Sequence, residues 1–540
     1  MTNLEERAAT PNLSRTMVAA NSRAFLAFLL CTAVLSGALV MVIQVLGSRV
    51  VGPFFGVSLF VWTSLITVTL LALAVGYAIG GLLSDRFHQP GYLFGIILLA
   101  GVLALFIPIL KGPVLKACLP LGLKAGAFAS TLILFGPVLL LLGCVSPYLV
   151  KLAARELQNL GRMVGGLYAL STIGSTAGTV LTGFVLIAYL SVDQIFALTG
   201  GLLMALAAIY FVAFQRRWWV LVILVLPFLL YQPQEAVSRT MADGTQVDLV
   251  HRQDNYYGDI KVVDYSFGKT HYREMIIDGM VQGGIDLADN LSVYEYTYFM
   301  KFLPFMLAPE GKRCLMIGLG LGVIPSWYEQ QGIQCDVVDI NQAVAEIARD
   351  YFNFRISGDL FIEDARYFLN STDRDYDYIL LDVFSGDITP AHLLSREALS
   401  LMRERLRPNG VLAINLIGSL QRETFMTASI VKTLQSVFNV VDIYPTFNTE
   451  KSTIGVGNLA LMSYQGERRE LRIDHARFQS HARVSEQVFA NLGRRYEFPA
   501  HTPAMILTDA YNPVDFFDGW LRETVRKSIL ESTNWDILIS

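Results

Sequence analysis

Four features in the second half of the chain could hold and activate a small charged substrate. The run Gly318-Leu319-Gly320-Leu321-Gly322 follows an apolar stretch, and glycine at such a turn lets the backbone approach a ligand. Carboxylates recur at Asp339, Asp364 and Asp382, again at the ends of apolar stretches. A carboxylate about 20 residues beyond the glycines can accept hydrogen bonds from ribose hydroxyls, and a later one can accept from an adenine amino group. Their order predicts a site for an adenosine-containing molecule.

Alternating strands and helices must position these residues. Helical patterns separate five apolar runs suited to strands: Arg313–Gly318, Cys335–Ile340, Leu360–Glu363, Tyr378–Asp382 and Val411–Leu416. This alternation predicts a parallel sheet with helices on both faces, which binds ligands at the carboxyl ends of its strands. The glycine turn has Val323 where the dinucleotide fingerprint has a further glycine, which favours S-adenosylmethionine over NAD.

The first half of the chain has a different composition. Hydrophobic residues make up 53% of the 540 residues, and nearly all long uncharged runs precede Tyr231. A helix needs about 20 apolar residues to cross the hydrocarbon core of a membrane. Six runs reach about that length: Ala24–Leu46, Leu59–Leu83, Gly91–Leu110, Ala125–Val150, Val164–Leu190 and Val192–Phe214. A seventh run, Trp218–Tyr231, is shorter, and we expect it to be interfacial or re-entrant.

The distribution of Lys and Arg in the short loops predicts the orientation of these spans. One side would carry the larger set: Arg7, Arg15, Arg23, Arg86, Lys151, Arg155, Arg162, Arg216 and Arg217. The other side would carry Arg49, Lys111, Lys116 and Lys124. We therefore expect a multi-pass protein of the inner (cell) membrane, in contact with the lipid bilayer, whose C-terminal domain is cytoplasmic.

The fifth span is rich in small residues and contains Gly174 and Gly178 at GxxxG spacing. Small residues let helix backbones approach closely. Three explanations remain open for them: packing within one bundle, a dimer seam and a substrate path.

The expected domain organisation has four parts. A polar tail covers residues 1–22, a transmembrane helical domain 23–232, a small β-hairpin lobe 246–300 and a Rossmann-like domain 301–540. The net charge of −4 and the lack of a dense Lys/Arg block argue against a nucleic-acid partner. The five cysteines are scattered without metal-ligand spacing, so we expect no metal site.

Residues 246–464 resemble the spermidine synthases, or polyamine aminopropyltransferases, in their membrane-fused bacterial branch. Asp278-Gly279-Met280-Val281-Gln282 is similar to the family's Asp-Gly-x-x-Gln turn, and Tyr296 with Leu303-Pro304 is similar to its next helix. The resemblance implies a decarboxylated S-adenosylmethionine donor, no prosthetic group and release of 5′-methylthioadenosine. It also leaves a homodimer open, since the soluble family commonly forms dimers.

The same resemblance implies roles for individual residues. Gln282, Asp339 and Asp364 would bind the nucleoside, together with the turn of Gly318, Gly320 and Gly322. Asp382 would be the catalytic carboxylate that orients and deprotonates the attacking amine.

The amine side of the site departs from the family pattern. Leu321 replaces an aspartate that in the family helps to hold the ammonium group of the donor, and Thr297-Tyr298 replaces a His-Glu pair. The family's Asp-Ser-x-Asp-Pro motif becomes Asp382-Val383-Phe384-Ser385-Gly386-Asp387. Candidates for substrate binding are Tyr296, Asp387 and Asp509. Each has a structural alternative: packing for Tyr296, a helix cap for Asp387 and a simple turn for Asp509.

Four functions follow from these observations. The first is spermidine synthase-like chemistry at the propyl carbon of S-adenosylmethionine or its decarboxylated form. The second is a lyase that converts intact S-adenosylmethionine to methylthioadenosine and homoserine lactone, because Leu321 weakens selection for the decarboxylated donor and tethering makes the attack intramolecular. A methyltransferase would share the glycine turn and Asp339 without needing the turn at residues 278–282. The non-enzymatic alternative is a membrane transporter or sensor with a regulatory nucleoside-binding domain.

Overall fold

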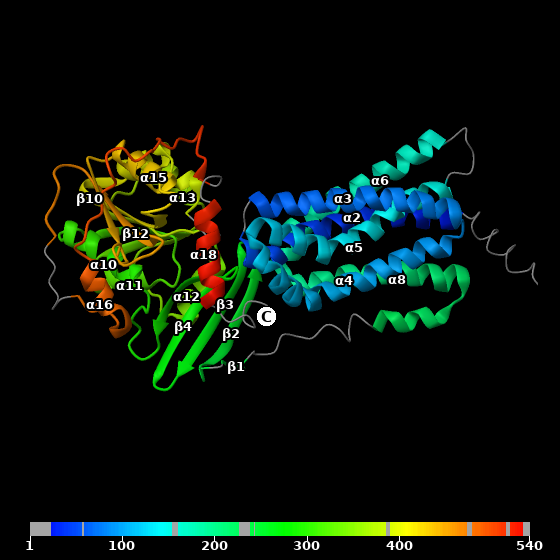
Figure 1. Cartoon of the computed structure of the whole chain (residues 1–540), viewed down its shortest axis with the longest axis horizontal. Helices are drawn as coiled ribbons and strands as arrows, with labels where there is room; N and C mark the ends of the chain where they lie inside the picture. The colour runs from blue at the N-terminus through cyan, green and yellow to red at the C-terminus, as the bar shows by residue number, and fades with distance from the viewer. Residues whose placement is uncertain are drawn as a thin grey trace, which may run out of the picture. The chain divides into compact units, whose positions relative to one another are not determined.

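The computed structural model describes residues 23–56, 59–153, 160–225, 238–241, 243–384, 389–471, 478–514 and 519–532. The chain forms two compact units (Figure 1). The first contains the residues up to 235 together with 254–256, and the second contains almost all residues from 236 onward.

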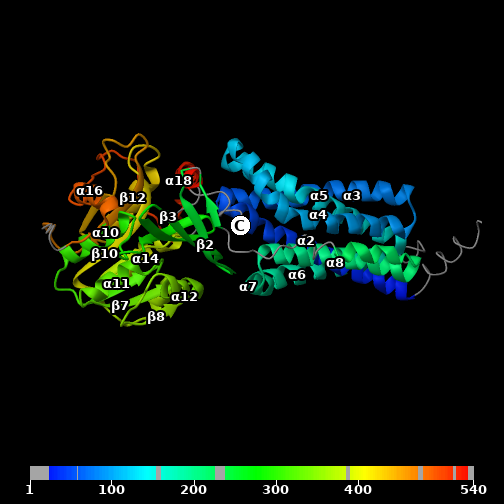
Figure 2. The ribbon, with the colours of Figure 1, turned by 90° about the horizontal axis from the view of Figure 1, so that it is seen from below.

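The first unit is a bundle of long helices that lie side by side (Figures 1 and 2). They are α2 (Arg23–Phe55), α3 (Leu59–Arg86), α4 (Pro90–Cys118), α5 (Gly122–Ala153), α6 (Leu160–Leu181) and α8 (Val192–Gln215). Among the described residues, 5 continuous helical stretches are long and apolar enough to cross a membrane. The longest, Pro90–Ala153, contains both α4 and α5, joined by the 3-10 turn Leu119–Leu121. All six apolar runs predicted as spans are therefore mainly helical.

The seventh predicted run is described only in its first part. Trp218–Val225 forms the 3-10 helix η4, in which Trp218 and Trp219 are exposed. The remainder of this run, like the polar tail at residues 1–22, lies outside the described residues.

The GxxxG face of α6 packs against α2 of the same chain. A Cβ atom at Gly174 would lie 2.0 Å from the carbonyl oxygen of Val34, and one at Gly178 would lie 2.4 Å from that of Ala38. Between them, the Ser175 hydroxyl donates to the Gly37 carbonyl at 3.0 Å. The contact supports packing within one bundle, because α2 already occupies the face that a dimer seam would use.

We expect Gly174→Ala to destabilise the helical unit. Its methyl group needs space that Val34 fills, and overpacking typically costs about 1–3 kcal/mol. Gly165→Ala is the matched control, because nothing lies within 4 Å of a Cβ atom at Gly165 on the same helix. Thermal unfolding of the detergent-solubilised protein measures both variants. Equal unfolding temperatures would show that the close α2–α6 contact does not stabilise the bundle.

The second unit begins with a five-stranded antiparallel lobe in chain order. Its strands are β1 (Ser238–Thr240), β2 (Gln246–Asn255), β3 (Gly258–Phe267), β4 (Thr270–Ile277) and β5 (Met280–Asp286). Asp278 and Gly279 form the two-residue connection of β4 to β5, with φ of 48° and 76°. A tight hairpin of this type needs positive φ at both central positions, which explains the Asp-Gly pair.

A seven-stranded sheet follows, in the order β11-β12-β10-β9-β6-β7-β8. The strands are β6 (Arg313–Ile317), β7 (Gln334–Asp339), β8 (Leu360–Ile362), β9 (Tyr376–Leu381), β10 (Leu406–Ser419), β11 (Val440–Pro445) and β12 (Val456–Tyr464). The five strands β6–β10 are parallel as predicted, whereas β12 runs antiparallel to both β10 and β11. The predicted parallel sheet is therefore confirmed for its five strands, and β11 and β12, which the prediction did not include, extend it through antiparallel pairs. The short link from β11 to β12 has no crossover helix, so it can join only antiparallel neighbours.

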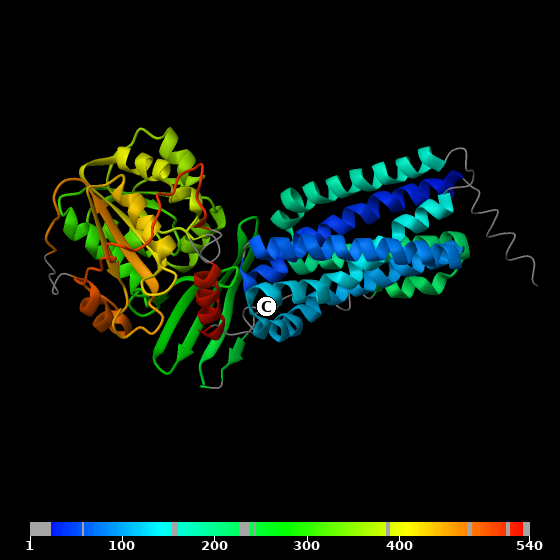
Figure 3. The same cartoon turned by 45° about the horizontal axis from the view of Figure 1, so that its top comes forward.

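Helices cover both faces of this sheet (Figures 1 and 3). One hydrophobic cluster packs α10 (Tyr296–Leu307), α11 (Val323–Gln330), α12 (Gln342–Tyr351) and α16 (Ala482–Asn491) against the strands. A second cluster involves α13 (Ala365–Ser371), α14 (Arg396–Glu404) and α15 (Phe425–Gln435). The strand order reverses at β6, which lies between β7 and β9. Open α/β sheets bind ligands at such a switch point, beyond the carboxyl ends of the strands.

Candidate active site

The glycine turn connects β6 to α11 at the switch point. The φ angles of Gly318, Gly320 and Gly322 are 86°, 51° and 76°, in a region of backbone conformation that residues other than glycine rarely adopt. A Cβ atom at Gly318 would lie 2.3 Å from the Asp382 carbonyl oxygen, and one at Gly322 would lie 2.4 Å from the Phe354 ring. At Gly320 nothing lies within 4 Å. The outer two glycines are thus needed for packing, while the middle one leaves its backbone accessible to a ligand.

Asp339 ends β7 and is held by two backbone amides. Its Oδ2 accepts from the N–H of Leu319 and its Oδ1 from the N–H of Asn341, each at 2.8 Å. Burial raises the pKa of Asp339 above its ordinary value, although these two amides act in the opposite direction. Each carboxylate oxygen can accept a second hydrogen bond, so the fixed carboxylate can receive the two hydroxyls of a ribose.

Asp364 follows β8 and caps α13. Its Oδ1 accepts from the backbone N–H groups of Arg366 at 2.9 Å and Tyr367 at 3.0 Å. Its Oδ2 lies 3.5 Å from Nε2 of His392. The N–H of the preceding Glu363 donates to the Asp339 carbonyl at 3.1 Å, which keeps the two carboxylate-bearing segments adjacent. One oxygen of Asp364 therefore serves the helix, and the other retains capacity to accept from an adenine amino group.

Asp382 follows β9, beside the glycine turn. Its Oδ1 accepts from Nδ2 of Asn415 at 2.8 Å, and Oδ1 of Asn415 accepts from Nδ2 of Asn458 at 2.9 Å. Burial raises the pKa of Asp382 to about 6, against the lowering effect of the Asn415 hydrogen bond. A partly buried carboxylate whose pKa is near neutral is suited to accept a proton from a substrate.

Asn415 and Asn458 were not identified from the sequence. They lie on β10 and β12, and Asn415 is the one polar residue within the predicted apolar run Val411–Leu416. A buried amide in an apolar strand needs hydrogen-bond partners, which is the signal that could have drawn attention to it.

The lobe meets the glycine turn through β5 and the start of α10. The Tyr296 hydroxyl donates to the Gln282 carbonyl at 2.9 Å. A Cβ atom at Gly283 would lie 3.0 Å from Cδ1 of Leu321 and 3.4 Å from the Tyr296 hydroxyl. Burial, and next the negative charge of Asp382, raise the pKa of Tyr296 well above its ordinary value. Tyr296 thus stays protonated, within electrostatic reach of the predicted catalytic carboxylate.

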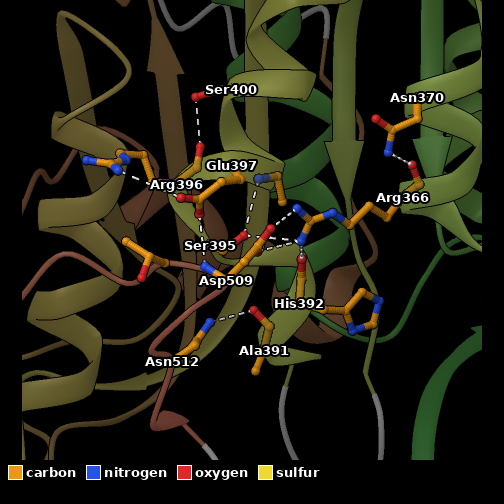
Figure 4. Close-up of polar contacts among 12 residues, drawn as sticks. Arg366, Asn370, Ala391, His392, Ser395, Arg396, Glu397, Ser400, Asp509 and Asn512 are labelled. Atoms are coloured by element: carbon orange, nitrogen blue, oxygen red, sulfur yellow. Dashed lines mark hydrogen bonds and ion pairs between the residues drawn. The ribbon is translucent and has the colours of Figure 1, made fainter.

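Three other predicted site residues have a different status. Asp509 pairs both carboxylate oxygens with the Arg366 guanidinium (Figure 4), so it contacts α13 rather than the glycine turn. Asp387 lies outside the described residues. The Gln282 amide donates to the Met280 carbonyl at 3.3 Å, within its own strand. The structure therefore brings together the glycine turn, Asp339, Asp382, Tyr296 and the backbone of Gln282.

Parts of the chain are similar to a known family and to known proteins. Residues 294–458 match the spermine/spermidine synthase domain. An N-terminal histidine N-methyltransferase of Emericella nidulans is 28% identical over 372 residues, which cover 62% of this chain and 65% of that protein. A polyamine aminopropyltransferase of Vibrio vulnificus is 29% identical over 182 residues, which cover 32% of this chain and 60% of that protein. The chain thus spans less than two thirds of either relative's length.

The crystal structure of spermidine synthase from Thermotoga maritima matches with a TM-score of 0.34 and 14% identity, over 48% of this chain and 96% of that one.

Proposed function

We propose that this chain, whose C-terminal unit is spermidine synthase-like, transfers a propyl-linked group from an S-adenosylmethionine-type donor and releases 5′-methylthioadenosine. The observation that carries the proposal is the position of Asp382. Its partly buried carboxylate, with a pKa of about 6, follows the strand next to the glycine turn and is oriented by Asn415. The polyamine aminopropyltransferase relative supports an amine as the acceptor.

The proposed reaction uses the residues as follows. Asp339 receives the ribose hydroxyls, Asp364 receives the adenine amino group, and the Gly320 backbone lies against the nucleoside. The acceptor amine attacks the propyl carbon attached to the sulfonium. The carbon–sulfur bond breaks, and its electron pair returns to sulfur to give neutral methylthioadenosine. The proton released by the amine passes to the Asp382 carboxylate.

Leu321 gives the lyase a specific observation in its favour. Its side chain is 6% exposed and packs where β5 meets the glycine turn, so it offers no charge to a donor ammonium group. Both donors carry this ammonium group, but only intact S-adenosylmethionine also has a carboxylate, which an aspartate at this position would repel and a leucine does not. Attack of that carboxylate on the γ-carbon would yield methylthioadenosine and homoserine lactone.

Methyl transfer is favoured by a different observation. The Emericella nidulans relative is an N-methyltransferase. Its match covers 62% of this chain, which is more residues than the second compact unit contains. The same glycine turn and Asp339 would hold S-adenosylmethionine, and the product would be S-adenosylhomocysteine instead of methylthioadenosine.

Mass spectrometry of the products separates these functions. The purified full chain would receive S-adenosylmethionine or its decarboxylated form, each with and without putrescine as the probe amine. We expect methylthioadenosine and an aminopropylated amine from the decarboxylated donor with putrescine. Methylthioadenosine with homoserine lactone from the intact donor alone would replace the transferase by the lyase. S-adenosylhomocysteine would show methyl transfer, and no turnover with retained nucleoside binding would support a sensor or transporter.

We also propose that the first unit crosses the inner membrane and leaves the C-terminal domain in the cytoplasm. The length and apolar character of its helical stretches and the loop charges support this arrangement. A green fluorescent protein fused after Ser540 should fluoresce, and alkaline phosphatase at the same position should be inactive. The reverse pattern would put the domain on the opposite side.

A further inference from the structure

A polar cluster joins the C-terminal strap, defined as residues 505–512, to Arg366 on α13 and to residues 391–397 (Figure 4). Nη1 of Arg366 donates to Oδ1 of Asp509 at 2.7 Å, and Nη2 pairs with Oδ2. Nη1 also donates to the His392 carbonyl at 2.9 Å and to the Ser395 hydroxyl at 3.3 Å. One guanidinium therefore joins the strap to the segment that carries His392.

Arg366 is also hydrogen-bonded, through its backbone, to Asp364, the residue predicted to bind the adenine. Its backbone N–H donates to Oδ1 of Asp364 at 2.9 Å, as part of the helix cap. His392, whose carbonyl Arg366 holds, places Nε2 3.5 Å from the other Asp364 oxygen. The backbone N–H of Arg366 thus holds one oxygen of the Asp364 carboxylate, and the His392 ring lies near the other.

The strap has further connections to the segment after β9. The Arg396 N–H donates to the Leu507 carbonyl at 2.8 Å. The Asp509 N–H donates to Glu397 at 3.0 Å, and the Asn512 amide donates to the Ala391 carbonyl at 2.7 Å. Strap and segment therefore form one hydrogen-bonded layer, which the Arg366–Asp509 pair joins to α13.

We propose that Arg366 and Asp509 form a latch that positions Asp364 for the adenine of the donor. This inference rests on the proposed function, in which Asp364 receives the adenine amino group. Both latch residues are positioning residues, because their side chains reach Asp364 only through the segment that carries His392. The Asp509 and Arg366 side chains are 45% and 23% exposed, so breaking the pair should loosen the adenine end without unfolding the domain.

The test measures binding of 5′-methylthioadenosine by calorimetry, together with kcat and KM for the donor that the full chain turns over. Asp509→Ala and Arg366→Ala should each raise Kd and KM about fivefold, as expected for a partly exposed ion pair. Their kcat should stay within about twofold, because the reacting atoms are not touched. Arg403→Ala, on the exposed side of α14, is the matched control and should change none of these values.

The exchange variant Arg366→Asp with Asp509→Arg keeps the ion pair and should recover most of the affinity. Thermal unfolding of every variant identifies any loss that comes from misfolding. Unchanged Kd and KM in both single variants would overturn the latch, and so would a fall in kcat without a change in Kd or KM. Either result would leave the proposed function intact. If the unmodified chain bound no adenosine nucleoside, the proposed function and the latch would fail together.

Discussion

Asp382→Asn is expected to lower kcat by about 10²–10⁴-fold, the range typical for loss of a general base. Asparagine keeps the shape of the side chain and can still accept from Asn415, but it cannot take a proton from the substrate. Binding of methylthioadenosine should therefore be retained. The measurements are product formation under saturating donor and calorimetric titration with methylthioadenosine. Asp375→Asn, an exposed position just before the same strand, is the matched control.

The pH dependence should report the same carboxylate. Asp382 must be ionised to accept a proton, and burial raises its pKa to about 6. We therefore expect kcat/KM to fall about tenfold per pH unit below that value, and to be level above it. A profile that stays flat from pH 8 to pH 5 would contradict the assignment of Asp382 as the base.

As pH rises through the pKa of Asp382, activity should rise and the stability of the folded protein should fall. Between about pH 4 and pH 6 the carboxyl group ionises in the unfolded chain but stays protonated in the folded one, so the free energy of unfolding falls as pH rises through this window. Asp382→Asn lacks this decrease. At pH 8 the variant should be more stable than the unmodified protein, by up to about 3 kcal/mol for a shift of this size. An inactive variant that is also less stable would indicate a structural role for Asp382.

Leu321→Asp is expected to shift donor preference towards decarboxylated S-adenosylmethionine by about 10–100-fold in kcat/KM. A carboxylate there could bond the ammonium group that both donors carry, and hydrogen bonds to charged groups contribute about 1.5–3 kcal/mol. Only the intact donor would oppose this gain, because its own carboxylate would be repelled. The new side chain would lie beside Gly283, near the Tyr296 hydroxyl, which can donate to it. Competition between the two donors, followed by mass spectrometry, gives the ratio directly.

Leu321→Asn is the control for that experiment, because it has the size of aspartate without its charge. A shift produced equally by Leu321→Asn would show that space, not charge, selects the donor. No shift in either variant would show that this position does not face the part of the donor that distinguishes the two molecules.

The sequence by itself determined the parts of the site that depend on local backbone geometry. The turn has positive φ at positions 318, 320 and 322, where residues other than glycine would be strained. At positions 318 and 322 the neighbouring atoms are also too close for a side chain. Asp278-Gly279 likewise predicts a tight hairpin, since both residues accept positive φ. Short apolar runs between helical patterns predicted the parallel strands, because a strand that is buried on both faces consists of a few consecutive apolar residues. Asp339 and Asp382 followed, since each directly ends such a run.

Only the tertiary structure decided which distant side chains complete these parts. Asn415 and Asn458 orient Asp382 from strands later in the chain, and Arg366 pairs with Asp509 across 143 residues. The GxxxG face of α6 packs against α2 rather than remaining free, and β12 inserts antiparallel between β10 and β11. Hydrogen bonds and close packing between distant segments depend on how the whole chain is folded. No local sequence pattern predicts these contacts, because the secondary structure around each residue would be the same whichever distant residue became its partner.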